Sequence, residues 1–360
     1  MNVDDRYPRI AEADLIRYTA AILAQRDTPE DYARITAEVL VASDVRGIES
    51  HGVARLEQYV AAIDAGILDP RAAPEIVRQS AATALVDAHN GLGQVVGVAA
   101  MRLAIQKALS ADVGVVSVQH SFHYGIAGYY AMMALEHNLI GMSLTNSSPL
   151  VAPTGSRAAL LGTNPIAFAA PTGGPLPFVL DMATSTVPRG RIEVAARKGI
   201  PLSAGWAMDA EGRPTLDAQA AMGGALLPLG GALESSGYKG YGLAAMVDIL
   251  TGVLSGSLYG PLIARLWEVE RPSDLGQFFM ALNPAAFGPL EQFQRRLQHL
   301  QQLLAEAPLA AGATEVLQAG EKEARATAYN RREGVPIHPK VVARLEELGA
   351  PAGLGPLPVR

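Results

Sequence analysis

The chain has 360 residues, of which 49% are hydrophobic and 18% are charged, and its formal net charge is −6 at pH 7. This composition allows a large buried core and excludes an intrinsically disordered chain. The negative charge argues against general nucleic-acid binding, which needs clustered cations to neutralise phosphates. The absence of cysteine excludes disulfides, zinc–thiolate sites, iron–sulfur clusters and a cysteine nucleophile.

Hydrophobic periodicity and turn residues predict helices at both ends of the chain and strands mixed with helices between them. The run Thr28-Pro-Glu-Asp31 is a helix-start signal within a helical region that covers residues 10–46. Further along, the pattern predicts helices over residues 52–65, 93–109, 124–137, 240–254 and 289–305. It predicts strands over residues 82–88, 113–118, 139–145, 178–182 and 277–282. We therefore expect a mixed α/β protein.

These elements suggest three parts. Residues 1–80 form an N-terminal helical part, and residues 81–285 form a sheet-containing cofactor and catalytic body. Residues 286–360 form C-terminal helices that return to the N-terminal part, with a Pro- and Gly-rich tail from residue 350 that we expect to be flexible.

Two features bear on location. The first ten residues contain two aspartates and no apolar run, so we expect no signal peptide. The longest apolar stretch, residues 241–263, contains Asp248 and several glycines, which favours a buried helix and loop over a membrane span. We expect a cytoplasmic protein with no membrane partner.

A glycine-rich turn follows the strand predicted over residues 82–88. Gly91, Gly93 and Gly97 resemble a dinucleotide fingerprint between a strand and a helix. However, the third glycine comes one position late, and Asp112 precedes the next strand rather than ending it. We therefore interpret the turn as one that packs the helix onto the sheet, and not as a Rossmann site.

The segment from Ser43 to Arg55 carries the first candidate site. His51 and Arg55 are four residues apart, so a helix that starts at residue 52 would place them on one face, which Tyr59 continues. An arginine can hold a carboxylate with two parallel hydrogen bonds, and a histidine can carry a proton. The pair therefore predicts an anion grip, although an N-terminal histidine with a solvated arginine is the alternative.

A second segment, residues 120–130, follows a predicted buried strand, and the carboxyl ends of strands commonly form sites in α/β sheets. His123 lies two residues before Gly125, which would let a flat ring approach closely. Metal binding by His120 and His123 is the rival interpretation. We reject it because no HExxH motif and no carboxylate at ligand spacing accompany them.

Several polar turns complete the candidates. Residues 145–149 and 162–165 are rich in hydrogen-bond donors, and residues 181–185 follow a strand and could bind a ribose or a phosphate. Lys239 opens a helix within a glycine-rich run, which is a natural position for a phosphate. Each turn alone could equally be a structural loop.

Taken together, these segments resemble one family. The runs DVRGIESHGVARLEQYV, HYGIAGYY, IGMSLTNSSPLVAPTG, GTNPIAFAAP, LDMATS, GYKGYGL and DLGQFF follow the order seen in the non-Rossmann malate/L-lactate dehydrogenase family, and the resemblance covers residues 14–334. It implies a non-Rossmann nicotinamide-binding fold with a mostly antiparallel central sheet. It also implies NAD or NADP as the cofactor and a homodimer with the active site near the subunit interface.

The resemblance assigns roles residue by residue. His123 matches the catalytic acid/base, which also contacts the cofactor, while His51 and Arg55 match a substrate-side pair. We add Tyr59 to the substrate side, and Ser147 matches a substrate-contacting serine. The expected cofactor contacts are Asp181, Met182, Ala183, Ser185, Arg191, Tyr238, Lys239, Gly320 and Glu321.

The chain departs from the family pattern at three positions. Arg191 stands where many members have lysine, which leaves NAD and NADP both open because either cation can meet a phosphate. Ser273 stands where some members have a substrate-contacting arginine, and Ala319 where some have proline. The substrate pocket is therefore the part that transfers least well.

The resulting hypothesis is hydride transfer between nicotinamide and a small 2-hydroxy or 2-oxo acid. Arg55 would bind the substrate carboxylate, and His123 would carry the proton. Reduction of a cyclic imino acid is the alternative within the same family, and no metal is expected. A non-catalytic protein that kept the fold is a further alternative, against which the joint presence of these residues argues.

Overall fold

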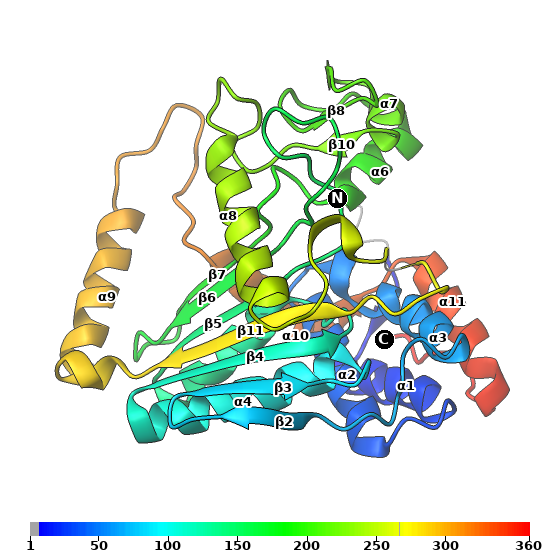
Figure 1. The fold of residues 1–360 in the computed structure, drawn as a ribbon, viewed down its shortest axis with the longest axis horizontal. Coiled ribbons are helices and arrows are strands. Elements are labelled where there is room, and N and C mark those ends of the chain that lie inside the picture. Colours follow the sequence, from blue (N-terminus) through cyan, green and yellow to red (C-terminus); the bar gives the residue numbers. More distant parts are fainter. Residues whose placement is uncertain (1–6, 266) are drawn as a thin grey trace.

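The computed structural model describes residues 7–265 and 267–360, and Figure 1 shows its arrangement. Residues 1–6, which belong to the segment expected not to be a signal peptide, lie outside the described residues. Within the described part, no helix is both long and apolar enough to cross a membrane.

A seven-stranded sheet forms the centre of the molecule, in the order β2-β3-β4-β11-β5-β6-β7. The strands are β2 (Glu75–Gln79), β3 (Thr83–Asp87), β4 (Val113–Ser121), β5 (Ile140–Thr145), β6 (Ile166–Ala170), β7 (Phe178–Met182) and β11 (Leu275–Leu282). The expected mostly antiparallel sheet needs correction, because the sheet is mixed: β3 and β4 run parallel, while the other neighbours pair antiparallel. A parallel pair needs a long crossover, which the helix α4 (Gly93–Ala111) provides.

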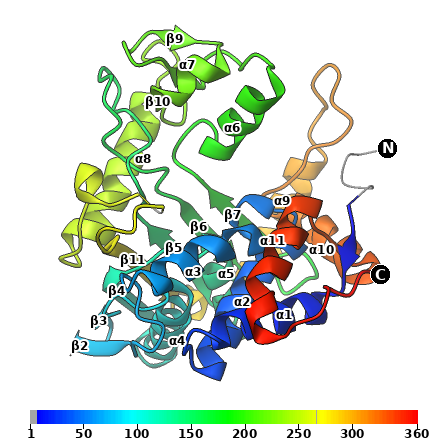
Figure 2. The ribbon, with the colours of Figure 1, turned by 90° about the vertical axis from the view of Figure 1, so that its right-hand side faces the viewer.

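Helices cover both faces of this sheet (Figures 1 and 2). On one face, α4, α5 (Ala127–Met133) and a 3₁₀ turn (Ala134–His137) enclose the largest apolar core with β3, β4, β6 and β11. On the other face lie α8 (Tyr238–Asp248) and a π-helical turn (Ile249–Val253). Strand β11 serves both cores, since Phe279 points into the first and Phe278 into the second.

Helices from both ends of the chain form a third core. They are α1 (Glu12–Ala24), α2 (Glu30–Val45), α3 (Leu56–Asp64) and α11 (Pro339–Gly349). Helix α10 (Glu321–Glu333) lies beside α2, where its buried Asn330 donates to the Val45 carbonyl. A short ladder between β1 (Arg9–Ile10) and β12 (Val335–Pro336) joins the two ends. In the C-terminal tail, Leu357 is buried and the Arg360 amide donates to the Arg9 carbonyl over 2.8 Å, while most of the other tail residues are exposed. The flexibility of this tail stays a prediction.

A smaller lobe stands at one side of the central sheet (Figure 2). It contains β8 (Ala207–Met208), β9 (Pro214–Thr215), β10 (Ala225–Leu226), α6 (Arg189–Lys198) and α7 (Ala218–Met222), and it has its own apolar core. Helix α9 (Leu290–Ala305) lies at the far end of the sheet in Figure 1, with Gln301 as its buried residue.

The strand directions place the candidate site. Strands β4 and β5 are both antiparallel to β11, β3 is parallel to β4, and β7 is two antiparallel steps from β5. Therefore β3, β4, β5 and β7 all run in one direction, and their carboxyl ends share one edge of the sheet. The turns that follow these four strands are the ones that the sequence marked as polar or glycine-rich.

Candidate active site

Two histidines from distant parts of the chain face each other at this edge. His123 lies two residues beyond the end of β4, and His51 ends a 3₁₀ turn (Glu49–His51). Their ring centroids are 5.8 Å apart, and the ring planes are inclined by 25°. The structure thus brings together two of the predicted catalytic residues.

The segment that carries His51 and Arg55 is not the helix that the sequence predicted. Two 3₁₀ turns, Glu49–His51 and Val53–Arg55, are separated by Gly52, which is extended, and the helix α3 begins only at Leu56. A β-carbon on Gly52 would lie 1.9 Å from an oxygen of the Asp44 carboxyl group. The glycine is therefore required because the buried Asp44 carboxyl group occupies the space beside it.

Asp44, at the end of α2, holds the segment of residues 49–55 in place. Its Oδ2 accepts a hydrogen bond from the Val53 amide over 2.8 Å. Burial raises the pKa of the Asp44 carboxyl from 3.8 to about 8, more than the Val53 amide lowers it. The carboxyl is therefore mostly protonated at neutral pH, and no signal in the sequence distinguished it from an ordinary aspartate.

Replacing Asp44 by asparagine should change the pH dependence of stability. Between pH 3.8 and about 8 the native state holds a proton that the unfolded chain has released, so raising the pH lowers the wild-type free energy of unfolding. Asp44→Asn cannot ionise, so its stability relative to wild type should rise by up to about 1.4 kcal/mol per pH unit in this window. Denaturant unfolding at several pH values, with the exposed Asp31→Asn as control, measures this slope, and parallel curves for wild type and Asp44→Asn would contradict the assignment.

Arg55 supplies a positive charge beside the histidines. Its Nε donates to the Ser50 carbonyl over 2.7 Å, and the guanidinium forms no ion pair with any acidic residue that the structure describes. Burial, followed by the charge of Arg55, lowers the pKa of His51 to about 4. Burial, with His51 and Arg55 as lesser causes, also holds the pKa of His123 well below its usual value of 6.5. Two neutral imidazoles and an unpaired arginine make this place favourable for an anion.

Tyr59 and Gln94 lie behind His123. The Tyr59 hydroxyl is 2.6 Å from Nδ1 of His123, and the Gln94 amide nitrogen donates to the same hydroxyl over 2.6 Å. Tyr59 and Gln94 are both fully buried. Tyr59 was predicted on the substrate side, but the structure places its hydroxyl against the histidine, and the sequence did not single out Gln94.

The glycine-rich turn before α4 explains how Gln94 reaches this position. A β-carbon on Gly93 would lie 2.2 Å from the Phe122 carbonyl oxygen, so only glycine lets the start of α4 approach the end of β4 this closely. The turn packs a helix against a strand, as the sequence predicted, and it also places Gln94 against the Tyr59 hydroxyl that contacts His123.

Asp181 connects the predicted cofactor run to the same region. Its Oδ2 accepts the Gly128 amide over 2.8 Å, at the start of α5, five residues after His123. Burial raises the pKa of Asp181 to about 6, although the Gly128 amide and Arg46 both lower it. Met182 and Ala183, which follow it, are half-buried.

The remaining predicted cofactor residues extend along β7 and beyond it. Gly320 packs on Val179 of β7, and Glu321 opens α10 beside it. At the other end, the Thr184 carbonyl accepts the Leu229 amide over 2.8 Å, and Gly240 of α8 packs against Leu229. This places the run that starts at Asp181 near the first turn of α8, where Tyr238 and Lys239 are exposed.

Two predicted cofactor residues have other partners in the structure. The Ser185 hydroxyl is buried and donates to the Val187 carbonyl over 2.9 Å. The exposed Arg191 guanidinium lies 5.6 Å from the centroid of the Trp206 ring, in the smaller lobe. Neither arrangement brings these two residues to the histidine pair.

Ser147 lies two residues beyond the end of β5, at the same sheet edge as His123. Its hydroxyl accepts the Thr163 amide over 3.0 Å, and its own amide donates to Oδ1 of Asn164 over 3.1 Å. The two polar turns that the sequence marked, at residues 145–149 and 162–165, therefore form one hydrogen-bonded unit.

His120, which the sequence offered as a possible metal ligand, contacts Asp87 at the end of β3. Its Nδ1 lies 2.9 Å from an oxygen of Asp87, which also accepts from Gln119. A carboxylate thus does lie beside His120, contrary to the expectation from spacing. Even so, among residues 7–265 and 267–360 no group of three or more histidine, cysteine or acidic residues is arranged to hold a metal ion.

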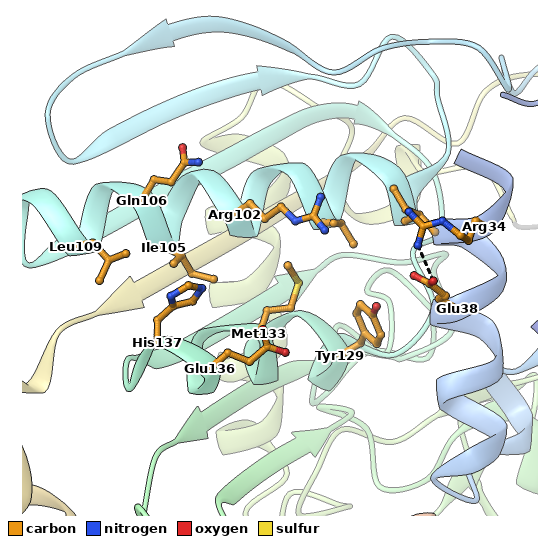
Figure 3. A pocket seen from close by; sticks show the side chains of 12 residues that line it. Arg34, Glu38, Arg102, Ile105, Gln106, Leu109, Tyr129, Met133, Glu136 and His137 are labelled. Atoms are coloured by element: carbon orange, nitrogen blue, oxygen red, sulfur yellow. Dashed lines mark hydrogen bonds and ion pairs between the residues drawn. The ribbon is translucent and has the colours of Figure 1, made fainter. Parts of the chain in front are cut away.

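A cavity of about 400 Å³ lies away from this edge, between α2, α4 and α5 (Figure 3). Arg34 and Glu38 form an ion pair of 2.6 Å at its side, and Arg102, Tyr129 and His137 also line it. None of its lining residues is a predicted site residue, so we do not assign the cavity to the chemistry.

Comparison with known proteins agrees with this geometry. A sequence model described as malate/L-lactate dehydrogenase matches residues 10–346. A malate dehydrogenase of Pyrococcus abyssi is 44% identical over 99% of this chain and 98% of its own length. A Δ1-pyrroline-2-carboxylate/Δ1-piperideine-2-carboxylate reductase of Pseudomonas putida is 34% identical over 94% of this chain and 96% of its own length.

Comparison with solved structures points to the same kind of protein. The solved structure of malate dehydrogenase from Pyrococcus horikoshii OT3 superposes with a TM-score of 0.91 at 41% identity, covering 99% of both chains. The match extends over the sheet edge, the helical ends and the smaller lobe alike. The chain therefore belongs to the malate/L-lactate dehydrogenase family, a family of oxidoreductases.

Proposed function

We propose that this chain is an NAD(P)-dependent dehydrogenase that interconverts a small 2-hydroxy acid and its 2-oxo acid. The observation that carries the proposal is the His51–His123 pair at the common strand edge, with an arginine beside it that has no acidic partner among the described residues. Such a set can hold a carboxylate and move a proton at the neighbouring carbon's oxygen.

Each residue of this set has a separate task. Arg55 binds the substrate carboxylate through its guanidinium fork. His51 has Nδ1 at 2.8 Å from the Ser50 hydroxyl, so its other nitrogen is left for the substrate. His123 takes the hydroxyl proton during oxidation and returns a proton to the carbonyl oxygen during reduction. When bound, the nicotinamide accepts or supplies the hydride.

The residues present fit a nicotinamide dinucleotide. Lys239 is an exposed cation in the first turn of α8, which suits a phosphate, and the Asp181 carboxyl is an acceptor for hydroxyl groups. Met182 and Ala183 would line the groups between these anchors. Ser185, Gly320 and Glu321 stay predicted cofactor contacts, with Gly320 and Glu321 beside Val179 at the other end of the run. Tyr238 would cover the cofactor beside Lys239, and Arg191 is the cation that could favour NADP over NAD.

Replacing Arg55 by lysine should mainly weaken substrate binding. One ammonium group cannot reproduce the planar fork, and a charged hydrogen bond contributes about 1.5–3 kcal/mol. We expect KM for the acid substrate to rise by about 10- to 100-fold, with kcat changed much less. Steady-state kinetics measure this, and an unchanged KM would contradict the carboxylate grip. Arg17→Lys, at an exposed position of α1, is the control.

Reduction of a cyclic imino acid is the second candidate. It is favoured by the likeness to the Δ1-pyrroline-2-carboxylate/Δ1-piperideine-2-carboxylate reductase of Pseudomonas putida, whose name identifies cyclic imino carboxylates as its substrates. Arg55 would grip the same carboxylate, and His123 would meet a ring nitrogen in place of an oxygen.

The exposed apolar surface of the turn after α8 supports a homodimer, which we also propose. Ile249, Val253 and Leu254 follow one another at helical spacing and are 56%, 55% and 59% exposed. An apolar patch of this kind is typical of a protein–protein contact. Sedimentation equilibrium would test the dimer.

The cytoplasmic location and the division of the chain into three parts, at residues 80 and 285, stay predictions.

A substrate panel tests the proposed function. Purified protein is mixed with NADH or NADPH and a set of 2-oxo acids and cyclic imino acids, and the loss of reduced-nicotinamide absorbance is followed. Activity with a 2-oxo acid supports the dehydrogenase and shows the preferred cofactor. Activity with cyclic imino acids alone supports the second candidate. No activity, and no rise in melting temperature with either cofactor, would contradict both.

A further inference from the structure

The Tyr59 hydroxyl has three polar neighbours in a place that excludes water. It lies 2.6 Å from Nδ1 of His123, 3.2 Å from the carbonyl oxygen of His123, and 2.6 Å from the amide nitrogen of Gln94. Both Tyr59 and Gln94 are 0% exposed. A phenol hydroxyl has one hydrogen to donate and two lone pairs to accept with. Its three contacts therefore constrain where the hydrogens are.

Counting donors and acceptors gives one arrangement that satisfies all three contacts. The Gln94 nitrogen can only donate, so it fills one lone pair of the phenol oxygen. The His123 carbonyl can only accept, so it takes the phenol hydrogen. The second lone pair must then be met by a hydrogen on Nδ1 of His123. In this arrangement the neutral imidazole has no hydrogen on Nε2.

The orientation of the Gln94 amide and the amide of Gly125 could change this assignment of hydrogens. Rotating the Gln94 side-chain amide by half a turn would place its oxygen, which can only accept, against the phenol. The phenol hydrogen would then go either to that oxygen or to the His123 carbonyl. The phenol oxygen would still need the hydrogen on Nδ1. The Gly125 amide lies 3.4 Å from Nδ1 and favours the opposite tautomer. This contact is longer than the 3.2 Å contact between the phenol and the His123 carbonyl, which the phenol hydrogen can make only when Nδ1 carries its own hydrogen.

We propose that Tyr59, held by Gln94, is a positioning residue that keeps the proton of neutral His123 on Nδ1 and leaves Nε2 free for the substrate. The proposal rests on the acid–base role of His123 given above. During oxidation the substrate O–H bond breaks and an Nε2–H bond forms, while the carbon loses its hydride to the oxidised cofactor and a C=O bond forms. The imidazolium keeps its Nδ1–H bond to the phenol oxygen, and reduction reverses each change.

The fold explains why these two residues stand together. Tyr59 is on α3 and Gln94 is the second residue of α4, and the close approach of Gly93 to the Phe122 carbonyl places α4 directly behind His123. The stacking of His51 on the other side of the His123 ring holds its plane. The ring is therefore fixed in both orientation and tautomer, as a general base requires.

The tautomer can be observed directly by nitrogen NMR of protein labelled with ¹⁵N-histidine, with His123→Asn identifying the His123 signals. In wild type at neutral pH we expect a protonated Nδ1 and an unprotonated Nε2. In Tyr59→Phe, which keeps the ring and its packing on Phe122, the signals should move toward the other tautomer. Oxidative kcat should fall by about 10- to 100-fold, a share of the usual effect of general acid–base catalysis, with KM little changed.

Tyr18→Phe is the matched control. The Tyr18 hydroxyl is buried in α1 and has no hydrogen-bond partner among the residues that the structure describes, so its removal should leave the His123 signals and kcat as in wild type. Gln94→Leu removes the hydrogen bond that Gln94 donates to the Tyr59 hydroxyl. It should move the His123 signals in the same direction as Tyr59→Phe, by a smaller amount.

A wild-type spectrum with the proton on Nε2 would overturn the proposal, even if every variant failed to fold. An unchanged tautomer and a kcat within twofold of wild type in Tyr59→Phe would also overturn it. The roles of His123 and Tyr59 are tested separately. If His123→Ala kept its turnover, the acid–base role itself would be wrong. If His123→Ala lost turnover while the proton lay on Nε2, only the role of Tyr59 would be wrong.

Discussion

His123→Ala should lower kcat by about 10²–10⁴-fold in both directions, because it removes the group that moves the substrate proton. The cofactor dissociation constant should change little, since the expected cofactor anchors lie along β7 and α8. Single-turnover rates and cofactor titration separate these two quantities.

The pH dependence of the reaction rate is a second test of His123→Ala. The pKa of wild-type His123 is held well below 6.5, so the imidazole is neutral near pH 7 and is ready to act as the base in oxidation. Reduction needs the protonated form, so its kcat/KM should rise as the pH falls below 7. This rise should be absent in His123→Ala. His299→Ala, at an exposed position of α9, should behave as wild type. Turnover within a few-fold of wild type in His123→Ala would show that another group carries the proton.

Gly93→Ala should have the second-largest effect, on stability and on turnover together. The new β-carbon would lie 2.2 Å from the Phe122 carbonyl oxygen and 2.5 Å from that of His123, and both are backbone atoms that no side-chain rotation can move aside. Overpacking of this kind costs about 1–3 kcal/mol or more, and a displacement of about 1 Å at a catalytic group can cost about 10²-fold in rate. Thermal unfolding and kcat measure both effects.

Cofactor binding decides what the Gly93 result means. If the glycine-rich turn packs α4 behind His123, NADH or NADPH should still raise the melting temperature of folded Gly93→Ala protein. A dinucleotide fingerprint at this turn predicts instead that cofactor binding is lost first. Gly223→Ala is the control, because that glycine has an ordinary helical backbone and its added β-carbon would meet only the Ala220 carbonyl at 3.7 Å.

Local patterns predicted most of the elements that bury apolar side chains, but they gave no bounds for β6 or α11. The strand over residues 178–182 has the predicted bounds, and the helix predicted from Gly93 begins there. Elements without a buried apolar face were missed. Strand β2 is exposed along its whole length, and α10 buries only an asparagine, so neither shows a hydrophobic period.

The site was predictable as far as the chain carries recognisable motifs. His51, Arg55 and His123 stand in such motifs, and the structure brings the two histidines together. Gln94 stands in an apolar helix with no motif of its own, so only the packing at Gly93 reveals it. The insertion of β11 between β4 and β5 joins residues more than a hundred positions apart, which local pattern does not encode.

The junction of the two chain ends has a consequence for the order of folding during synthesis. Arg9 and Ile10 pair with Pro336 and Val335, and the Asn330 amide donates to the Val45 carbonyl at the end of α2 over 3.0 Å. The helix that leads to His51 thus lacks part of its packing until the last tenth of the chain has left the ribosome. At about 5–20 residues per second, the early helices wait many seconds for it. We expect nascent chains to form the central sheet first and to become competent for catalysis only after release.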